Sequence, residues 1–278
     1  MQRAPKLTLN NGVEMDQAGF GTYKVPPEET AALVTSALDA GYRHIDTAAL
    51  YGNEEGVGAA VRNFTDAGHV VREDLFVTSK LWNADQGYDA AFRAFDASLD
   101  RLGFDYLDLY LIHWPCPGRG LFVATYRALE EIYASGRVRA IGVSNFTQEH
   151  LEELAAATGI VPAVNQVELH PWLAQRGLRG FHEAHGIRTV AWSPLGRGAV
   201  LADPVIKEMS AELGRTPAQV VLRWHVQAGN TVIPKASSED RITGNLDVFS
   251  FELDDAQMAA LDALDRGQRT GSDPREVN

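Results

Sequence analysis

Four side chains in the first half of the chain have a combined chemistry that suits proton transfer to an oxygen atom. They are a carboxylate, a phenol, an ammonium and an imidazole, at Asp46, Tyr51, Lys80 and His113. A buried lysine must be paired or neutral, and Asp46 is a suitable partner. An ammonium beside a phenol lowers the pKa of the phenol, so Tyr51 could act as a general acid near neutral pH. His113 could donate a hydrogen bond that positions or polarises a carbonyl oxygen.

Each of these residues taken singly also has a structural explanation, as a core ion pair, a packed tyrosine or a satisfied histidine. Their places in the pattern of predicted elements favour the chemical interpretation. Asp46 ends one predicted strand, Lys80 and His113 directly follow two others, and Tyr51 lies in the loop after Asp46. Because functional residues of a barrel lie at the carboxyl ends of its strands, we expect the four side chains to meet there.

Strand-like and helix-like segments alternate along the chain, after a hairpin pattern in which residues 6–9 and 13–15 flank an Asn10-Asn11-Gly12 turn. The predicted strands are 18–21, 43–46, 75–79, 107–112, 140–143, 163–167, 188–191 and 231–233. The predicted helices are 28–40, 53–64, 88–102, 121–134, 148–157, 177–185, 204–213 and 217–227, and Asn53 is expected to be the N-cap of the second. Short strands that are apolar on both faces indicate a parallel sheet covered by helices. About eight such units favour a (β/α)8 TIM barrel, formed as a single domain by residues 1–278.

Other folds and chemistries lack their signatures in this sequence. A doubly wound sheet would carry a G-x-G-x-x-G turn after its first strand, and none is present there. A metal-dependent hydrolase would need clusters of histidine and aspartate ligands at several strand ends. Here His113 is the only histidine at the carboxyl end of a predicted strand. His182 and His185 are three positions apart, not the four of a zinc-binding helix, and no G-x-S-x-G turn occurs. We therefore expect no metal site.

Composition restricts the partners and the compartment. The chain of 278 residues has a formal net charge of -12, which argues against nucleic acid and anionic membranes as partners. No segment approaches the roughly 18 to 20 apolar residues of a membrane helix, and the N-terminus has no secretory signal pattern. The one cysteine, Cys116, excludes an internal disulfide. These features favour a cytoplasmic protein.

Several motifs, in order and with matching spacing, resemble the aldo-keto reductase superfamily. They are GYRHIDTAALYGNEEGVG from residue 41, Lys80, HWP from 113, IGVSNF from 141, VNQVELHP from 164, WSPLG from 192 and IPK from 233. The resemblance extends from the N-terminal hairpin to the C-terminal tail. Within the superfamily, the chain most resembles the bacterial branch that includes the 2,5-diketo-D-gluconate reductases.

This resemblance implies a catalytic tetrad made of the four residues already singled out. Tyr51 would be the general acid, Lys80 would tune it, Asp46 would pair with Lys80, and His113 would orient the substrate carbonyl. The implied activity is NADPH-dependent reduction of aldehydes or ketones, of small dicarbonyl or keto-sugar type, to alcohols by hydride transfer. A regulatory barrel that binds the cofactor without significant turnover is the alternative, although an intact tetrad argues against it.

The resemblance also implies an extended NADP(H) molecule bound across the strand ends, without a Rossmann motif. Its carboxamide would be held by Ser144, Asn145 and Gln166, and its nicotinamide ring would stack on Trp192, where the wider family has tyrosine. The implied cofactor contacts are Gly21, Thr22, Asp46, Ser144, Asn145, Gln166, Trp192, Ser193, Leu195, Gly196, Lys235, Ala236, Ser237, Ser238, Arg241 and Asn245.

The segment implied to hold the adenosine 2′-phosphate departs from the family pattern. Lys235 and Arg241 are kept, but Ala236 lacks a hydroxyl, Ser238 stands where close relatives carry arginine, and Glu239 adds a negative charge. Two cations still favour a phosphate over a bare hydroxyl. We therefore expect NADP(H) to be preferred and NAD(H) to be usable with weaker preference.

Aromatic residues in the predicted loops are the candidates for contact with the small-molecule carbonyl substrate. They are Tyr23, Trp82 and Trp114, together with His113, and an apolar mouth of this kind discriminates weakly between substrates. Arg197 is equally well explained as a ligand for an anionic group and as a solvated loop residue. The tail from 273 to 278 resembles a C-terminal loop that borders the active site in the family. Members of the family are often monomers, so the resemblance also implies a monomer.

Overall fold

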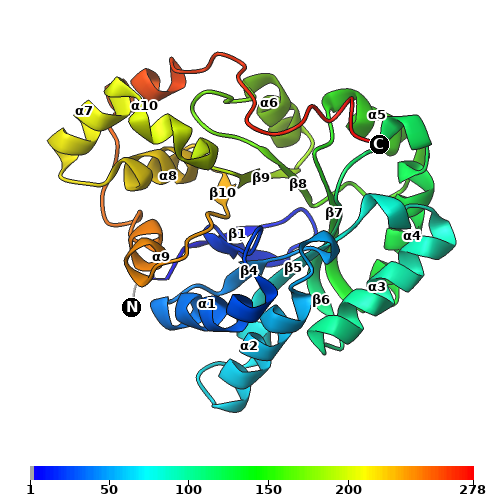
Figure 1. The fold of residues 1–278 in the computed structure, drawn as a ribbon. Helices are drawn as coiled ribbons and strands as arrows, with labels where there is room; N and C mark the ends of the chain where they lie inside the picture. Colours follow the sequence, from blue (N-terminus) through cyan, green and yellow to red (C-terminus); the bar gives the residue numbers. More distant parts are fainter. Residues whose placement is uncertain (1–2) are drawn as a thin grey trace.

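Eight parallel strands form a closed ring at the centre of the computed structural model, which describes residues 3–278 (Figure 1). Around the ring they are β3 (Gly19–Gly21), β4 (His44–Asp46), β5 (Phe76–Leu81), β6 (Leu107–Ile112), β7 (Val138–Ser144), β8 (Val164–Glu168), β9 (Arg188–Trp192) and β10 (Thr231–Val232). A parallel bridge between Ala18 and Val232 joins the first and last strands. The predicted barrel is confirmed.

Helices follow the strands and surround the ring (Figure 1). They are α1 (Pro27–Ala40), α2 (Glu54–Asp66), α3 (Tyr88–Leu102), α4 (Phe122–Ala134), α5 (Gln148–Ala157), α6 (Arg176–Ala184), α7 (Pro204–Leu213) and α8 (Pro217–Gln227). The sequence predicted each of these within a few residues. It did not predict α9 (Glu239–Leu246) and α10 (Asp255–Asp262), which are too short to show a clear helical period.

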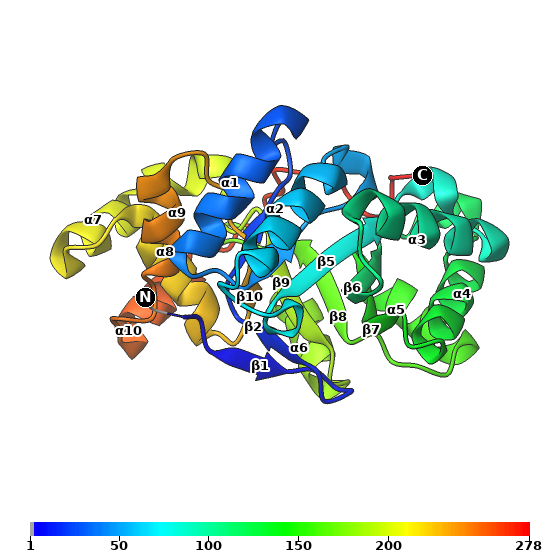
Figure 2. The same ribbon diagram turned by 90° about the horizontal axis from the view of Figure 1, so that it is seen from below.

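The predicted N-terminal hairpin is also present and closes one end of the barrel. Strands β1 (Lys6–Thr8) and β2 (Glu14–Asp16) pair antiparallel, and Gly12 adopts a positive φ of 85° in the turn. Leu9 and Met15 are buried in one apolar cluster with residues from the inside of the barrel. The hairpin therefore plugs the end of the barrel opposite to the C-terminal segment (Figure 2).

Alternation along the strands decides which side chains face the interior of the barrel. On β6, Leu109 and Leu111 belong to the inner cluster, whereas Tyr110 packs in the outer cluster with the helices. On β5, Phe76 is in the inner cluster, and Lys80, four positions later, faces the same way. We predicted that this strand ends at residue 79, but it continues to Leu81, so Lys80 lies within the sheet.

Among residues 3–278, every helix is too short or too polar to cross a bilayer.

Several histidines are buried without charge partners in the outer layer of the fold. His182 accepts a hydrogen bond from Asn165 through Nε2 (2.9 Å), and its Nδ1 lies 2.8 Å from the Thr189 hydroxyl. Burial lowers the pKa of His182 from its ordinary 6.5 to about 4, and it lowers that of His225 to about 3. Both rings are therefore neutral in the folded protein at pH values where the unfolded chain takes up protons.

This difference predicts that the folded protein loses stability in mild acid. Below pH 6.5 the unfolded state binds a proton at residue 182 that the folded state excludes, so the free energy of unfolding falls as the pH falls. In His182→Gln, this fall should be shallower by about 1.4 kcal/mol per pH unit between about pH 6 and 4.5. Urea unfolding at several pH values measures the slope, with His185→Gln, at an exposed ring, as the control. Equal slopes in wild type and His182→Gln would contradict the assignment.

Candidate active site

A cavity of about 330 Å³ opens at the carboxyl ends of the barrel strands. Of the predicted site residues, it is lined by Gly21, Tyr23, Asp46, Tyr51, Trp82, His113, Trp114, Ser144, Asn145, Gln166, Trp192, Ser193 and Lys235. Lys80 lies behind this lining and is fully buried. The predicted residues that do not line the cavity are Thr22, Leu195, Gly196, Ala236, Ser237, Ser238, Arg241 and Asn245.

Lys80 lies at the mouth of the barrel, and its ammonium group is completely buried. No other lysine or arginine in the described residues is buried to this extent. Lys80 Nζ donates to Asp46 Oδ1 (2.6 Å), to the Thr47 carbonyl (2.9 Å) and to Tyr51 Oη (3.4 Å). Burial lowers the pKa of Lys80, and the Asp46 carboxylate raises it again in part. The three acceptors match the three donors of an ammonium, so this geometry fits the charged form.

Asp46 also ties together opposite sides of the barrel. Gln166 Nε2, from β8, donates to Asp46 Oδ2 (2.8 Å), while Asp46 Oδ1 accepts from Lys80. In a ring of eight strands, β4 and β8 are separated by four positions on either side, so this bond spans the mouth. Both carboxylate oxygens are thereby used, and the Gln166 Oε1 atom receives no hydrogen bond from the described residues.

Tyr51 stands where the sequence placed it, but its predicted pKa shift is wrong. Burial raises the pKa of Tyr51 well above its usual range, and the Asp46 carboxylate and Tyr23 raise it further. The prediction considered the Lys80 ammonium alone, whereas that charge is already balanced by Asp46. Tyr51 is therefore protonated at neutral pH, and among the described residues no acceptor takes its proton, which leaves the phenol as a proton donor to the cavity.

His113 lies beside Tyr51 as a neutral imidazole. Burial lowers its pKa well below the usual range, and the nearby Lys80 charge lowers it further. Its ring centroid is 5.7 Å from that of Tyr51 and 5.3 Å from that of Trp82. Its buried Nδ1 has no hydrogen-bond partner in residues 3–278. A neutral ring carries one N–H, so His113 can donate a hydrogen bond to a carbonyl oxygen between itself and Tyr51.

A second hydrogen-bond network supports the far wall of the cavity. Trp192 Nε1 donates to Asn145 Oδ1 (2.8 Å), and Asn145 Nδ2 donates to the His113 carbonyl (3.0 Å) and to Ser144 Oγ (3.1 Å). Asn145, Ser193 and Arg197 have positive φ values of 64°, 47° and 54°. Three non-glycine residues in this conformation around one cavity indicate strain held by the surrounding fold, as is common at functional sites.

Asn53 is a residue whose role the sequence patterns predicted wrongly. It precedes α2 as expected, but its side chain makes no capping bond to that helix. Instead Nδ2 donates to the carbonyls of Thr22 (2.9 Å) and Val25 (3.1 Å), and Oδ1 accepts from the Thr47 hydroxyl (2.9 Å). Asn53 therefore fastens the loop that carries Tyr23 to the loop that carries Tyr51. A capping pattern cannot reveal such a contact between distant loops.

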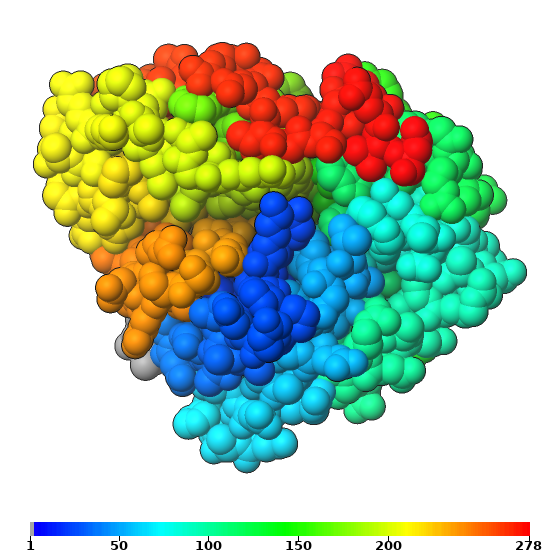
Figure 3. All heavy atoms as spheres, viewed as in Figure 1, coloured from blue at the N-terminus to red at the C-terminus, as the bar shows by residue number. Residues whose placement is uncertain are grey.

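Several further lining residues were not among the predicted contacts. They are Leu50, Pro194, Arg197, Ile233, Gly271, Ser272 and Val277. Leu50 directly precedes Tyr51 in the chain, and the structure leaves its apolar side chain exposed. The last three belong to the C-terminal segment, which lies across this face of the molecule (red in Figure 3). Together with the Tyr23, Trp82 and Trp114 rings they make the cavity largely apolar above its polar floor.

Two cations, Lys235 and Arg241, lie on the side of the cavity towards α9. Lys235 lines the cavity and is exposed, and Arg241 donates to the hydroxyls of Ser238 and Ser237, both at 3.0 Å. Among the described residues, neither cation has a carboxylate within 4.0 Å. Unpaired cations beside hydroxyl groups suit a phosphate. Asn245 is mostly buried on the same helix.

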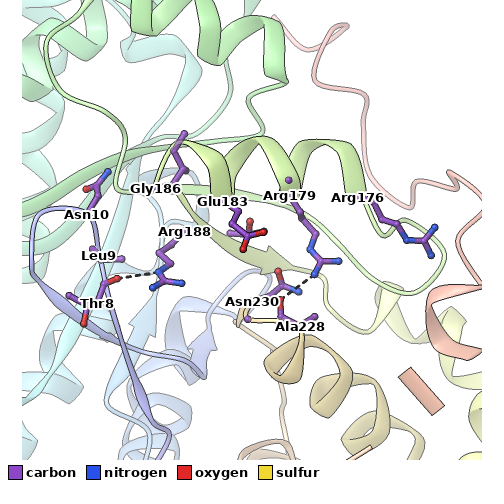
Figure 4. Close-up of a pocket in the computed structure, with 14 residues that line it drawn as sticks. Thr8, Leu9, Asn10, Arg176, Arg179, Glu183, Gly186, Arg188, Ala228 and Asn230 are labelled. Carbon is purple, nitrogen blue, oxygen red and sulfur yellow. Dashed lines mark hydrogen bonds between the residues drawn. The ribbon is translucent and has the colours of Figure 1, made fainter. Parts of the chain in front are cut away.

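A larger groove, of about 660 Å³, lies elsewhere, between the hairpin, α6 and the end of α8 (Figure 4). Its arginines are committed to the protein, because Arg179 donates to the Ala228 carbonyl and Arg188 to the Thr8 carbonyl. Arg176 lies 3.9 Å from Asp265. The groove holds no phenol or histidine for proton transfer. The smaller cavity contains both a phenol and a histidine, Tyr51 and His113, and is therefore the candidate active site. Within residues 3–278 no group of three or more His, Cys, Asp or Glu side chains that could hold a metal ion occurs.

The chain is similar to known proteins over most of its length. The model of the aldo/keto reductase family matches residues 16–266. An aldo-keto reductase of Mycolicibacterium smegmatis is 54% identical over 275 residues, covering 99% of this chain and 98% of that protein. A glyoxal reductase of Bacillus subtilis is 49% identical over 272 residues, covering 98% and 96%. A crystal structure of a Gox0644 mutant in complex with NADPH superposes with a TM-score of 0.94 at 48% identity, covering all of both chains.

The site geometry predicts that His113 does not titrate in the physiological range. Because burial and Lys80 both disfavour the imidazolium, the ring should remain neutral as the pH falls through the ordinary histidine pKa of 6.5. Nitrogen-15 NMR of the histidine side chains measures this directly, with a His113→Gln spectrum to assign the resonance. A midpoint near the ordinary histidine value would show that the cavity stabilises the charged ring.

Proposed function

The chain belongs to the aldo/keto reductase family, and from this membership we propose that it reduces the carbonyl group of small aldehydes and ketones with NADPH. The observation that carries the proposal is the contact of Tyr51 with the Lys80–Asp46 ion pair on the floor of the cavity. A regulatory barrel without turnover would have no need of this costly buried pair, which makes that alternative the weaker one.

The residues at the cavity fit the cofactor. Trp192 offers a flat ring to the nicotinamide, and Gln166 keeps Oε1 available for a carboxamide N–H. At the other end of the cavity, Lys235 and Arg241 are unpaired cations suited to the 2′-phosphate. At Gly21, which lines the cavity, a Cβ would lie 2.8 Å from the Ile233 carbonyl oxygen, so the close approach of the Ile233 backbone requires glycine there.

When bound, NADPH supplies the hydride for the carbonyl carbon. Tyr51 donates its proton to the substrate oxygen, because it is protonated and adjoins the cavity. The Lys80 ammonium, 3.4 Å from Tyr51 Oη, stabilises the phenolate that remains. Asp46 keeps the ammonium in place, and the neutral His113 ring donates a hydrogen bond that orients the oxygen.

The cavity supports a finer proposal about the substrate. Its apolar walls, made by Tyr23, Trp82 and Trp114, and its modest volume suit small dicarbonyl or keto-sugar compounds. The similarity to a glyoxal reductase favours the same substrate class. Tryptophan at position 192 supports a place in the branch that includes the 2,5-diketo-D-gluconate reductases. We further propose that residues 1–278 act as a single-domain monomer in the cytoplasm.

Replacement of Tyr51 tests the proposed chemistry. Tyr51→Phe keeps the ring but removes the proton, so the rate of methylglyoxal reduction should fall by about 100-fold or more. NADPH binding, measured by fluorescence, should change by less than about twofold, because the lost hydroxyl belongs to the substrate side. Lys80→Met should lower the rate similarly. Unchanged turnover in Tyr51→Phe would show that another group donates the proton.

Cofactor preference can be tested in the α9 loop. Ser238→Arg adds a third cation beside Lys235 and Arg241, so NADPH should bind about tenfold more tightly while NADH binding stays the same. Thr243→Arg, which adds the same charge on another part of α9, is the matched control. Titration of each variant with both nucleotides gives the two dissociation constants. Equal tightening of NADH would show that the new charge does not meet the 2′-phosphate.

A further inference from the structure

The buried carboxylate of Glu168 has no part in the chemistry proposed above, yet it lies next to the cavity. We propose that Glu168 is a positioning residue that holds the C-terminal segment, residues 269–278, against Trp192 and so completes the substrate pocket. This proposal rests on the proposed function for its kinetic consequence. Its structural consequence, the fastening of the segment, is independent of any activity.

Glu168 ends β8, and its side chain is completely buried. Oε1 accepts hydrogen bonds from the Thr270 backbone N–H (2.6 Å), the Thr270 hydroxyl (2.5 Å) and the Gly271 N–H (3.1 Å). His170 Nε2 lies 3.2 Å from the same oxygen, and Arg269 lies 3.8 Å from Oε2. A buried charge with this many donors is a strong attachment point for the segment that supplies them.

The charge state of Glu168 agrees with this role. Burial alone would raise its pKa, but the hydrogen bonds from His170 and Thr270 lower it to about 2. Glu168 is therefore an anion at neutral pH. A carboxylate accepts without donating, so it matches two consecutive backbone N–H groups that have no other partner in the described residues.

The attachment acts on Trp192 through direct contact. Glu168 and Trp192 are register partners on β8 and β9, so they lie side by side. A Cβ added to Gly271 would come within 2.5 Å of the outer edge of the Trp192 ring, which means that the backbone of the segment packs on the indole. Holding Gly271 therefore also restricts the ring that would stack on the nicotinamide.

The contact continues from Trp192 towards the reacting groups. The indole N–H donates to Asn145, and Asn145 donates to the carbonyl of His113. From the other side, Gly271 and Ser272 contribute directly to the wall of the cavity. One anchored segment thus supports both a cofactor-binding surface and the substrate-facing wall.

Within residues 3–278, the far end of the segment has one comparable attachment. The Asn278 side chain accepts a hydrogen bond from the Gly118 N–H (2.6 Å) in the loop after β6. Between the two ends, the segment runs along one side of the barrel, past α6 towards α5 (Figure 1), and the ion pair of Asp273 among the described residues is with Arg275 of the segment itself (2.7 Å). Loss of the Glu168 attachment should therefore loosen residues 269–272, which are the ones that touch Trp192.

Two readouts separate positioning from a general effect on stability. If the segment detaches, trypsin gains access to the bond after Arg269, and cleavage removes a peptide of defined mass. If the pocket wall is lost, the KM for the carbonyl substrate rises, whereas kcat is kept because Tyr51, Lys80 and Asp46 make no hydrogen bond to the segment in the described residues.

The experiment compares Glu168→Gln with Asp108→Asn. Asp108 is a matched control, since it is an equally buried carboxylate that accepts from Arg72, Arg139 and the Val77 N–H, on β6 and away from the segment. Glu168→Gln presents an amide to the backbone donors in place of an anion. Thr270→Val removes only one donor, and it serves as the milder variant if Glu168→Gln fails to fold.

We expect Glu168→Gln to be cleaved after Arg269 about tenfold faster than wild type, and its KM for methylglyoxal to rise about fivefold with kcat within twofold. Thr270→Val should shift both quantities in the same direction by less, and Asp108→Asn should shift neither. Cleavage and KM in Glu168→Gln that equal those of Asp108→Asn would overturn the proposal. If the wild type reduces no carbonyl, the proposed function fails, and the trypsin rates alone decide the role of Glu168.

Discussion

The structure depends above all on the need to keep the charge of Lys80 inside a protein barrel. A buried ammonium is tolerated only if its protons have hydrogen-bond acceptors and its charge is balanced. Each of the three acceptors of Lys80 also has a second role in the site. Asp46 balances the charge, and the bond to the Thr47 carbonyl fixes the loop after β4. The Tyr51 oxygen accepts the third hydrogen bond of the ammonium. Gln166 then fixes the second Asp46 oxygen from across the mouth. The ion pair thus determines where the phenol stands and couples opposite strands of the barrel.

The sequence revealed the elements whose position follows from strand alternation and strand ends. Asp46, Lys80 and His113 could be predicted because parallel strands bring their carboxyl ends to one face. The pKa of Tyr51 could not, since its direction depends first on burial and then on the nearby Asp46 carboxylate, and the sequence gives the extent of neither effect. Asn53 was mistaken for a helix cap because its partners, Thr22 and Val25, are near only in space. The family resemblance indicated a C-terminal loop at the site, but not its attachment to Glu168.

The two ends of the barrel meet different physical demands. At the hairpin end, Leu9 and Met15 fill the interior with apolar contacts that stabilise the fold. At the other end, the interior is filled by a buried ion pair, and Asn145 and Ser193 adopt strained backbone conformations. The stability of the hairpin end makes such costly features tolerable at the mouth.

The seam between β3 and β10 has a consequence for how the protein folds. Contacts across it join the two ends of the chain, as when Gln17 donates to the Asn230 carbonyl 213 positions away. Closing so long a loop is entropically costly, so contacts of this kind form late, after local units have assembled. Gly21 and Lys235, which both line the cavity, stand on opposite sides of this seam. We therefore expect the refolding chain to acquire its ligand-binding capacity abruptly, in the step that closes the barrel, while most of its helices have formed before.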